Sequence, residues 1–369
     1  QELIQSFGLT TSQFSSLFTA PMIVAIFLSF VGGMISDKVG SKKVINISFV
    51  IAGIGMIGRV FANSYMPFFL CMALTGFSNM FVNINASKIT ASWFEQEKLG
   101  ILMGIFAFCG QLPGAFATAT TAVLFDSRTS AFIVSAIFCI SVFVLWLLFV
   151  KDKPEDTMEE REKIDQENQP SIGDSLKVVL SNKGIWLVSI CIMMALGSTV
   201  TLSTFMPMAL QTMYGIDLKV CGTIASMLTL GNCIGSITGP IVFSKIKNVK
   251  VFVSGAAVLS FAGIIMCWRF PSIFVLHILV LYTGIVLGAS MPIFLSAPVL
   301  LEGLGTKYAG SAAGVISTLQ LLGAVLIPTY ILTPIAGDNY SLLFMLASIC
   351  MVIMFLCGLL LPQFGNNQK

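Results

Sequence analysis

The stretch Gly32–Lys43, GGMISDKVGSKK, is a short charged segment that separates two long apolar runs. The run 11–35 leads into it and the run 43–62 leads out of it, and both runs are rich in Ile, Val, Phe and Gly. A helix that spans a bilayer needs about 20 apolar residues, and each run is long enough. We therefore interpret Gly32–Lys43 as a loop between two membrane spans, with three lysines on one side of the bilayer.

The composition of the whole chain supports the same interpretation. The 369 residues are 56% hydrophobic and only 10% charged, and the mean hydropathy is +0.93. A soluble protein of this size has about 25% charged residues. The composition therefore excludes a soluble enzyme, a secreted domain and a nucleic-acid binder, and it predicts a multi-pass membrane protein whose surroundings are lipid.

Eleven apolar runs are long enough to span a membrane as helices, which satisfy their own backbone hydrogen bonds. They predict an all-α integral membrane fold. The runs are 11–35, 43–62, 65–87, 99–124, 130–150, 184–210, 218–243, 250–268, 272–299, 309–335 and 340–361.

Positive charge is distributed unequally between the two sets of connections. Of the 20 Lys and Arg residues, all but Arg59, Arg128, Lys219 and Arg269 fall on the set that includes Gly32–Lys43. Because cytoplasmic connections are enriched in Lys and Arg, we assign this set to the cytoplasm. The C-terminus is then cytoplasmic, and we expect the protein in the plasma (inner) membrane.

The longest loop divides the chain into two parts that resemble each other. We expect an N-terminal half at 1–150, a charged cytoplasmic loop at 151–183 and a C-terminal half at 184–369. Three pairs of segments recur at a spacing of about 206 to 210 residues, which indicates the parallel repeats of one large transporter architecture. The pairs are Gln5–Gln13 with Gln211–Lys219, Gly32–Lys43 with Thr238–Asn248, and Gly100–Gly104 with Gly310–Gly314.

The segment Gly32–Lys43 resembles the loop signature G-x-L-x-D-R-x-G-R-K of the major facilitator superfamily (MFS). Gly33, Asp37, Gly40 and Lys42 match the signature, and Ser41 replaces its usual arginine. The resemblance covers the whole chain and implies two six-helix halves related by a pseudo-two-fold axis. Five spans in the first half and six in the second are present, so we expect that the given chain lacks the first helix.

The residues of the signature have definable physical roles. Gly33 allows two helices to approach closely, and Gly40 supplies a turn that a Cβ would hinder. Asp37 is an anion at a helix end, where the N-terminus of a neighbouring helix stabilises it. In the family this acid latches the two halves on the cytoplasmic side, and the resemblance implies a partner near Ala309–Ser311. We expect Gly33, Asp37, Gly40 and Lys42 to form a conformational latch.

Substrate-binding candidates are uncharged, because every Asp, Glu, Lys and Arg lies in a loop or at the edge of a span. Asn79 and Asn83 lie four residues apart, hence on one helix face. His277 is the one group inside a span that titrates near neutrality, and it is a candidate for proton coupling or for simple packing. Amides are costly to bury without a purpose. The full candidate set is Asn79, Asn83, Gln111, Asn232, His277 and Gln320.

The preferred function is that of a secondary transporter, which moves a small organic solute by alternating access and is a candidate for proton coupling. One alternative is an anion antiporter of the oxalate or nitrate type, which would need an inward-facing cation. Another is a non-transporting membrane sensor. An enzyme is disfavoured, because the chain has no nucleophile with a base and no cluster of metal ligands. We expect no cofactor, no metal and a functional monomer.

Overall fold

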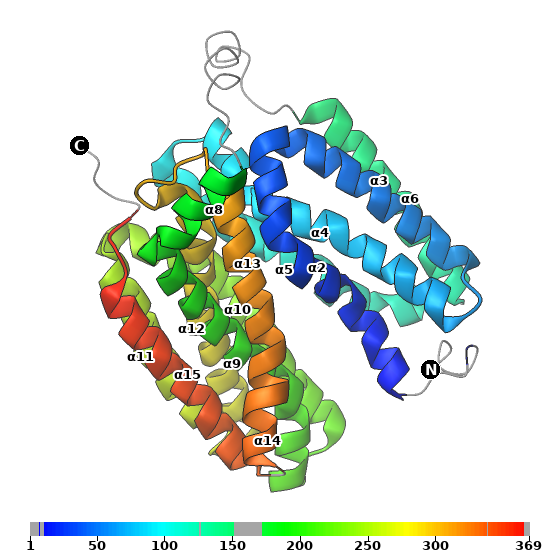
Figure 1. Cartoon of the computed structure of the whole chain (residues 1–369). Coiled ribbons are helices and arrows are strands. Elements are labelled where there is room, and N and C mark those ends of the chain that lie inside the picture. Colours follow the sequence, from blue (N-terminus) through cyan, green and yellow to red (C-terminus); the bar gives the residue numbers. More distant parts are fainter. Residues whose placement is uncertain (1–6, 8–10, 125–126, 151–171, 338, 365–369) are drawn as a thin grey trace. The chain divides into compact units, whose positions relative to one another are not determined.

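The computed structural model describes residues 7, 11–124, 127–150, 172–337 and 339–364, and throughout these ranges the regular structure is helical (Figure 1). The predicted all-α class is therefore confirmed. The predicted loop 151–183 is described only from residue 172 onward, and its first part lies outside the described residues.

The helices follow the apolar runs. They are α2 (Thr11–Val39), α3 (Ser41–Phe61), α4 (Tyr65–Trp93), η1 (Gln96–Lys98), α5 (Leu99–Leu124), α6 (Arg128–Phe149), α8 (Ile172–Ser181), α9 (Lys183–Tyr214), α10 (Leu218–Ile246), α11 (Val249–Met266), α12 (Ile273–Leu300), α13 (Ala309–Val325), η3 (Leu326–Leu332), α14 (Thr333–Ala336) and α15 (Tyr340–Leu360).

Ten helical spans in the described part of the chain are long and apolar enough to cross a membrane. The eleventh predicted run, residues 99–124, is the 26-residue helix α5. The prediction was too short at the end of the run 65–87, because α4 continues to Trp93. The run 309–335 is one continuous span whose middle widens into the π-helical turn η3, where Pro328 cannot donate a backbone hydrogen bond.

Asparagine side chains begin several of the C-terminal helices. The Oδ1 atom of Asn182 accepts from the backbone N–H of Gly184, 2.9 Å away, at the start of α9. Asn248 and Asn339 cap α11 and α15 in the same way. Such caps satisfy one of the N–H groups that the first turn of a helix leaves free. They explain why these spans begin at short polar residues rather than at the first apolar residue.

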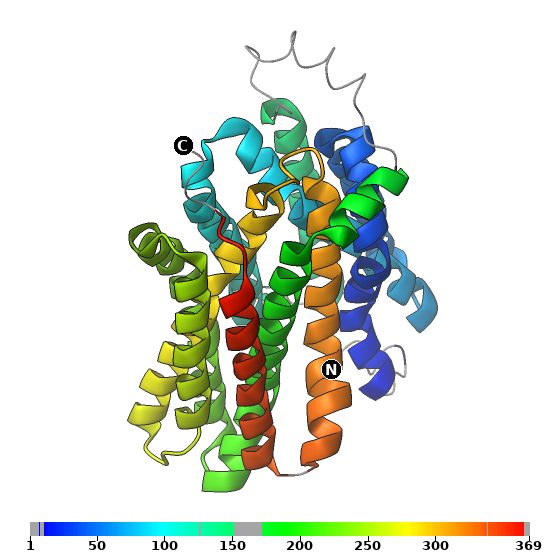
Figure 2. The same cartoon turned by 60° about the vertical axis from the view of Figure 1, so that its left-hand side comes forward.

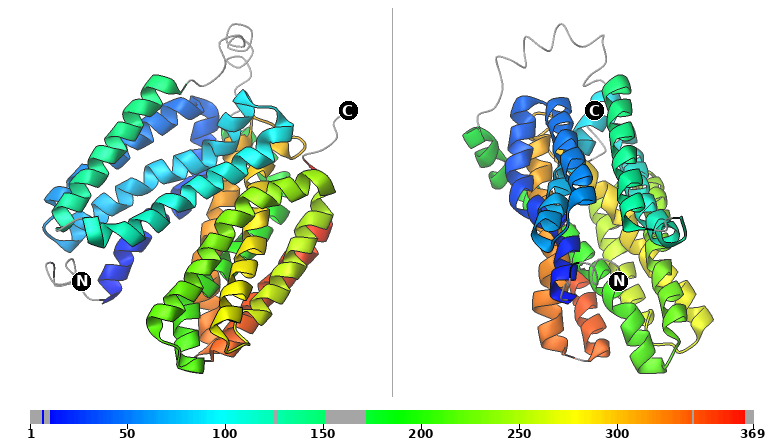
Figure 3. Two further views of the ribbon diagram at one scale, coloured as in Figure 1. Left: turned by 180° about the vertical axis from the view of Figure 1, so that it is seen from behind. Right: turned by 90° about the vertical axis from the view of Figure 1, so that its right-hand side faces the viewer.

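Contacts within the chain divide it into two compact units, each with its own helix packing. Unit 1 comprises Gln1–Trp93, Pro113–Val179 and Thr306–Thr318, and unit 2 comprises Phe94–Leu112, Leu180–Gly305 and Leu319–Lys369. Unit 1 thus contains the beginning of α13, and unit 2 contains the beginning of α5. In unit 1 α4 packs against α2 and α3, and in unit 2 α10 packs along α12 (Figure 3).

Both units use a glycine at the same point of the repeat to bring two helices into contact. In unit 1, a Cβ on Gly76 of α4 would lie 2.5 Å from the carbonyl oxygen of Pro21 on α2. In unit 2, a Cβ on Gly284 of α12 would clash with the carbonyl oxygen of Leu228 on α10. The two pairs are related by nearly the spacing that the sequence repeat predicts. Small residues at such positions let backbones approach, and dispersion contacts then hold helices together in lipid.

A glycine on α10 provides a test of this packing. We expect Gly235→Ala to destabilise the protein by about 1–3 kcal/mol, because the new methyl group would overlap the carbonyl oxygen of Ile285 on α12. The measurement is the midpoint of thermal unfolding of the purified protein in detergent. Gly222→Ala on the same helix is the matched control, since nothing lies within 4 Å of its Cβ position. Equal midpoints for the two variants would contradict the close packing of α10 on α12.

Candidate functional site

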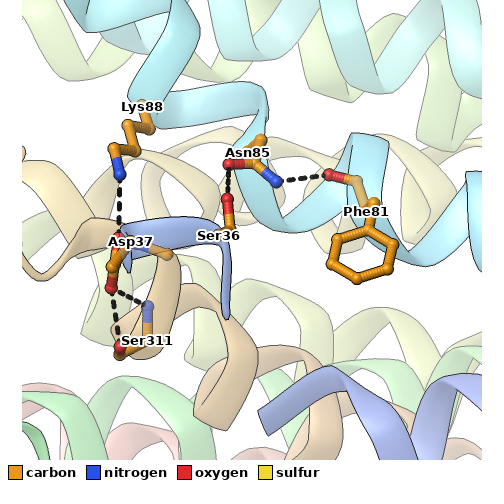
Figure 4. A network of polar contacts seen from close by, with 7 residues as sticks. Ser36, Asp37, Phe81, Asn85, Lys88 and Ser311 are labelled. Atoms are coloured by element: carbon orange, nitrogen blue, oxygen red, sulfur yellow. Dashed lines mark hydrogen bonds and ion pairs between the residues drawn. The ribbon is translucent and has the colours of Figure 1, made fainter. Parts of the chain in front are cut away.

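The centre of the candidate site is the carboxylate of Asp37, near the end of α2. Its side chain is only 1% exposed. One oxygen, Oδ1, accepts from the backbone N–H of Gly310 at 2.9 Å, and Oδ2 accepts from both the backbone N–H and the hydroxyl of Ser311 at 2.6 Å (Figure 4). Asp37 therefore binds the first turn of α13, at the position that the family resemblance implies.

The first turn of α13 suits an anion for two reasons. The N–H groups at the start of a helix have no partner within the helix, and the helix dipole places partial positive charge there. The hydroxyl of Ser311 adds a third donor from the same turn. Because hydrogen bonds to an ionised group are stronger than neutral ones, this turn holds the carboxylate firmly.

Lys88 is a partner of Asp37 that the sequence did not reveal. Its Nζ atom lies 2.9 Å from Asp37 Oδ1, and its side chain is 19% exposed. Lys88 follows the predicted span 65–87 and was expected in a connection, whereas the structure places it within α4. The signal that could have identified it is a lone lysine at the end of an apolar run, on the same side of the membrane as Asp37.

A second pair of buried polar side chains lies beside the carboxylate. Ser36 of α2 donates to the Oδ1 atom of Asn85 on α4, and the Nδ2 atom of Asn85 donates to the carbonyl of Phe81 at 2.8 Å (Figure 4). Ser36 and Asn85 are fully buried. Because a buried polar group without a partner is costly, this pair specifies how α2 lies on α4 next to Asp37. This pair was not predicted, because no pattern in the sequence indicates which residues of different helices are in contact.

The three other residues expected in the latch, Gly33, Gly40 and Lys42, have different surroundings. A Cβ on Gly33 would clash with the carbonyl oxygen of Gly310, so Gly33 lets α2 lie directly against the start of α13. Gly40 has a φ of +97°, a conformation that a side chain disfavours, and it forms the turn between α2 and α3. Lys42 is half-buried in the first turn of α3.

The candidate asparagines on α4 do contact each other. The Nδ2 atom of Asn83 donates to the backbone carbonyl and to the Oδ1 atom of Asn79, at 2.7 and 3.0 Å. Asn79 is exposed and Asn83 is half-buried. Within the described residues, the amide nitrogen of Asn79 makes no hydrogen bond. This nitrogen and the Oδ1 atom of Asn83 leave the pair with one free donor and one free acceptor.

The candidates Gln111, Asn232 and Gln320 belong to unit 2 and are half-buried. Gln111 and Asn232 each donate to the backbone one turn earlier in their own helix, to Ala107 at 3.4 Å and to Leu228 at 3.0 Å. No hydrogen bond joins the three side chains to one another in the part of the chain that the structure describes. Each amide therefore keeps acceptor capacity that the helices do not use.

His277 lies near the start of α12 and pairs with α10. Its Nδ1 atom is 2.8 Å from the carbonyl oxygen of Ile273, so Nδ1 carries a proton. Its Nε2 atom is 3.3 Å from the hydroxyl of Thr223, which also lies 2.7 Å from the carbonyl oxygen of Val220. A neutral His277 accepts from Thr223. A protonated His277 donates to Thr223, whose own proton then goes to Val220. The pair accommodates both forms.

Among the described residues, no group of three or more His, Cys, Asp or Glu side chains is arranged to hold a metal ion. The polar groups gather instead into the Asp37 cluster and the separate amides described above. This arrangement can hold a helix end and donate hydrogen bonds to a solute.

The model of the Major Facilitator Superfamily matches residues 1–328. The galacturonate transporter of Dickeya chrysanthemi is 23% identical over 278 residues, which are 72% of this chain and 81% of the relative. The membrane sensor protein UhpC of Salmonella typhimurium is 23% identical over 346 residues, 88% of this chain and 77% of the relative. The crystal structure of the human organic anion transporter MFSD10 has a TM-score of 0.75 at 15% identity, and covers 94% of this chain and 83% of that one.

The similarities in sequence and in structure agree with the helical fold and with the signature around Asp37. The family match extends over most of the chain, and the fold of a solved transporter matches nearly all of it. The chain belongs to the major facilitator superfamily, and it is a multi-pass integral membrane transporter for a small molecule rather than an enzyme.

Proposed function

We propose that this protein moves a small organic acid of the sugar-acid class across the membrane by alternating access, and that Asp37 latches its cytoplasmic side. The observation that carries the latch is the buried carboxylate and its four donors, of which three come from the start of α13 and one from Lys88. The similarity to a galacturonate transporter supports the substrate class. We propose that the two halves of the transporter are residues 1–150 and 184–369. We also propose that the protein lies in the plasma (inner) membrane and acts as a monomer.

Lys88 makes such a latch reversible. When the cytoplasmic side opens, α13 moves away from α2 and the carboxylate loses the donors of Gly310 and Ser311. A buried carboxylate without any partner is strongly destabilising. Lys88 lies on α4, which packs against α2, so it stays with Asp37 in the open state. The ion pair thus lowers the free-energy cost of opening.

The proposed solute path is polar but uncharged. Amide groups can donate to a carboxylate and accept from the hydroxyl groups of a sugar acid. The pair Asn79–Asn83 offers one free donor and one free acceptor. Gln111, Asn232 and Gln320 supply further amides. Such groups bind a monoacid without a fixed cation, and the weak individual contacts allow release on the other side.

His277 is the proposed site of proton coupling. The pair that it forms with Thr223 is hydrogen-bonded in the neutral and in the protonated form. Both forms therefore keep the imidazole Nε2 atom hydrogen-bonded to Thr223. A site of this kind can take up and release a proton during each cycle without disrupting the packing of α10 on α12.

The substrate class is tested by uptake into proteoliposomes that contain the purified protein. We expect accumulation of radiolabelled galacturonate or glucuronate, and no accumulation of galactose, which has the same ring but no carboxylate. Uptake of galactose at the same rate would overturn the proposed class. Binding of the acid without any uptake would favour a sensor like the relative UhpC over a transporter.

The latch is tested by Asp37→Asn and Lys88→Gln. We expect both variants to be expressed normally and to transport at about a tenth of the wild-type rate or less, because each loses a charge-assisted contact worth about 1.5–3 kcal/mol. The measurement is initial uptake in proteoliposomes. Lys98→Gln is the matched control, since Lys98 pairs with Glu95 on an exposed surface. Wild-type rates in Asp37→Asn would exclude the latch.

The polar path is tested by Asn79→Ala. We expect apparent affinity for the transported acid to fall up to about tenfold, the effect of one lost hydrogen bond of ~1.4 kcal/mol. The midpoint of thermal unfolding should stay unchanged, because Asn83 can still bond to the backbone carbonyl of residue 79. Asn63→Ala, at an exposed position between α3 and α4, serves as the control. An unchanged affinity would remove Asn79 from the path.

Coupling is tested by His277→Gln. Glutamine can occupy the same hydrogen bonds but cannot titrate, so we expect uptake driven by a pH gradient to be abolished while exchange of internal for external substrate continues. Both are measured in the same proteoliposomes. Thr223→Val is a second comparison, because it removes the hydroxyl that bonds to His277 Nε2 and keeps the imidazole itself. Equal loss of exchange and of driven uptake in His277→Gln would assign a binding or folding role instead.

A further inference from the structure

The second repeat lacks the acid that serves as a latch in the first. The sequence repeat aligns Asp37 of α2 with Phe243 of α10, and Gly310 of α13 with Gly100 of α5. A Cβ on Gly310 would lie 2.6 Å from Asp37 Oδ1, whereas the nearest atoms to a Cβ on Gly100 are 3.8 Å away. The start of α5 in unit 2 therefore has no contact that corresponds to the one made by Asp37.

A cavity of about 220 Å³ occupies this position within unit 2. Its walls come from η1 and the start of α5, from the ends of α10 and α12, and from the turn after α10. They include Glu97, Gly100, Ser244 and Lys247. The remaining contribution comes from Phe364, which follows α15 and is 4% exposed. A segment from the end of the chain thus meets the start of α5 where the first repeat has its acidic latch.

The segment Leu361–Phe364 is attached to unit 2 by neutral contacts. The side-chain amide of Gln363 bonds twice to the turn between α10 and α11: Nε2 donates to the carbonyl of Lys247 at 2.7 Å, and Oε1 accepts from the N–H of Val249 at 3.1 Å. Leu361 is fully buried, and Pro362 lies against Gly184 at the start of α9. In Figure 2 this red segment rises from α15 toward the cyan start of α5.

The turn that Gln363 binds requires such support. Lys247 has a φ of +56°, a left-handed conformation that costs free energy for a residue with a side chain. The turn leaves the carbonyl of Lys247 and the N–H of Val249 outside any helix ladder, and Gln363 pairs with both. A side-chain amide bonds here as a backbone peptide would, and it holds the turn in one geometry.

We propose that Leu361–Phe364 is a strap that closes the cytoplasmic end of unit 2, in place of the acidic latch that the second repeat lacks. Gln363 binds the turn after α10, and Phe364 lines the cavity beside the start of α5. The strap holds by amide hydrogen bonds and apolar contact, whereas Asp37 holds by charge. The two closures therefore respond to different substitutions, and the strap releases without protonation or loss of an ion pair.

The test is hydrogen–deuterium exchange of the purified full chain in detergent, without substrate. We expect Gln363→Ala to speed exchange about tenfold in peptides that cover Val249–Val253 and Leu99–Met103, because two hydrogen bonds are lost and the local structure opens more often. Peptides that cover Gly310–Ala313 should keep their wild-type rate. Phe364→Ala should speed exchange at Leu99–Met103 and leave Val249 protected by Gln363.

Two comparisons separate the strap from other effects. Gln211→Ala, an exposed glutamine at the end of α9, should change neither region. Asp37→Asn should speed exchange at Gly310–Ala313 and not at Leu99–Met103. The experiment therefore tests the strap separately from the proposed latch. Because no substrate is added, its result does not depend on the proposed substrate class. Unchanged exchange in Gln363→Ala would overturn the proposal. Equally faster exchange in every peptide would also overturn it, because the segment would then contribute only to overall stability.

Discussion

A carboxylate that is removed from water must be matched by donors, and Asp37 imposes this requirement on three helices at once. Its oxygens are matched by Lys88 on α4 and by the first turn of α13. Those donors reach the carboxylate only if α2 lies against both helices. Gly33 has no side chain that would keep α13 away from α2. The hydrogen bond between Ser36 and Asn85 fixes the position of α4 relative to α2. The packing around the end of α2 follows from this one charge.

Elsewhere the helices are held by shape rather than by charge. Lipid tails are as apolar as the side chains, so burial of apolar surface provides little force between helices in a membrane. Close contacts at glycine replace it, as at Gly76 with Pro21 and at Gly284 with Leu228. The same contacts occur in both units at corresponding points of the repeat. The repeat is thus preserved in the backbone packing even where the side chains have diverged.

The corresponding ends of the two repeats, at the end of α2 and at the end of α10, differ in chemistry although they correspond in sequence. The first uses an ion pair and a helix N-terminus, and the second offers Phe243, a cavity and the segment after α15. An ionic contact is strong, requires exact partners and weakens when either partner moves. Amide and apolar contacts are individually weaker and tolerate small shifts. If the proposed latch and the proposed strap both act, the transporter has two closures of different chemistry that substitutions can alter independently.

The sequence alone determined the class, the spans and the family. Runs of about 20 apolar residues have a single stable form in a bilayer, the helix, so their number and order follow from composition. The contact of Asp37 with the start of α13 was also expected, through the resemblance of Gly32–Lys43 to a family signature. Tertiary structure decided the partners: Lys88 and Asn85 for α2, Thr223 for His277, and Gln363 for the turn after α10. A sequence records which groups each helix carries, but a hydrogen bond between helices depends on how each helix is rotated about its axis and how far it is shifted along it. Those two quantities are determined by packing, which here brings together residues that lie from 49 positions apart, as Ser36 and Asn85 do, to 274 positions apart, as Asp37 and Ser311 do.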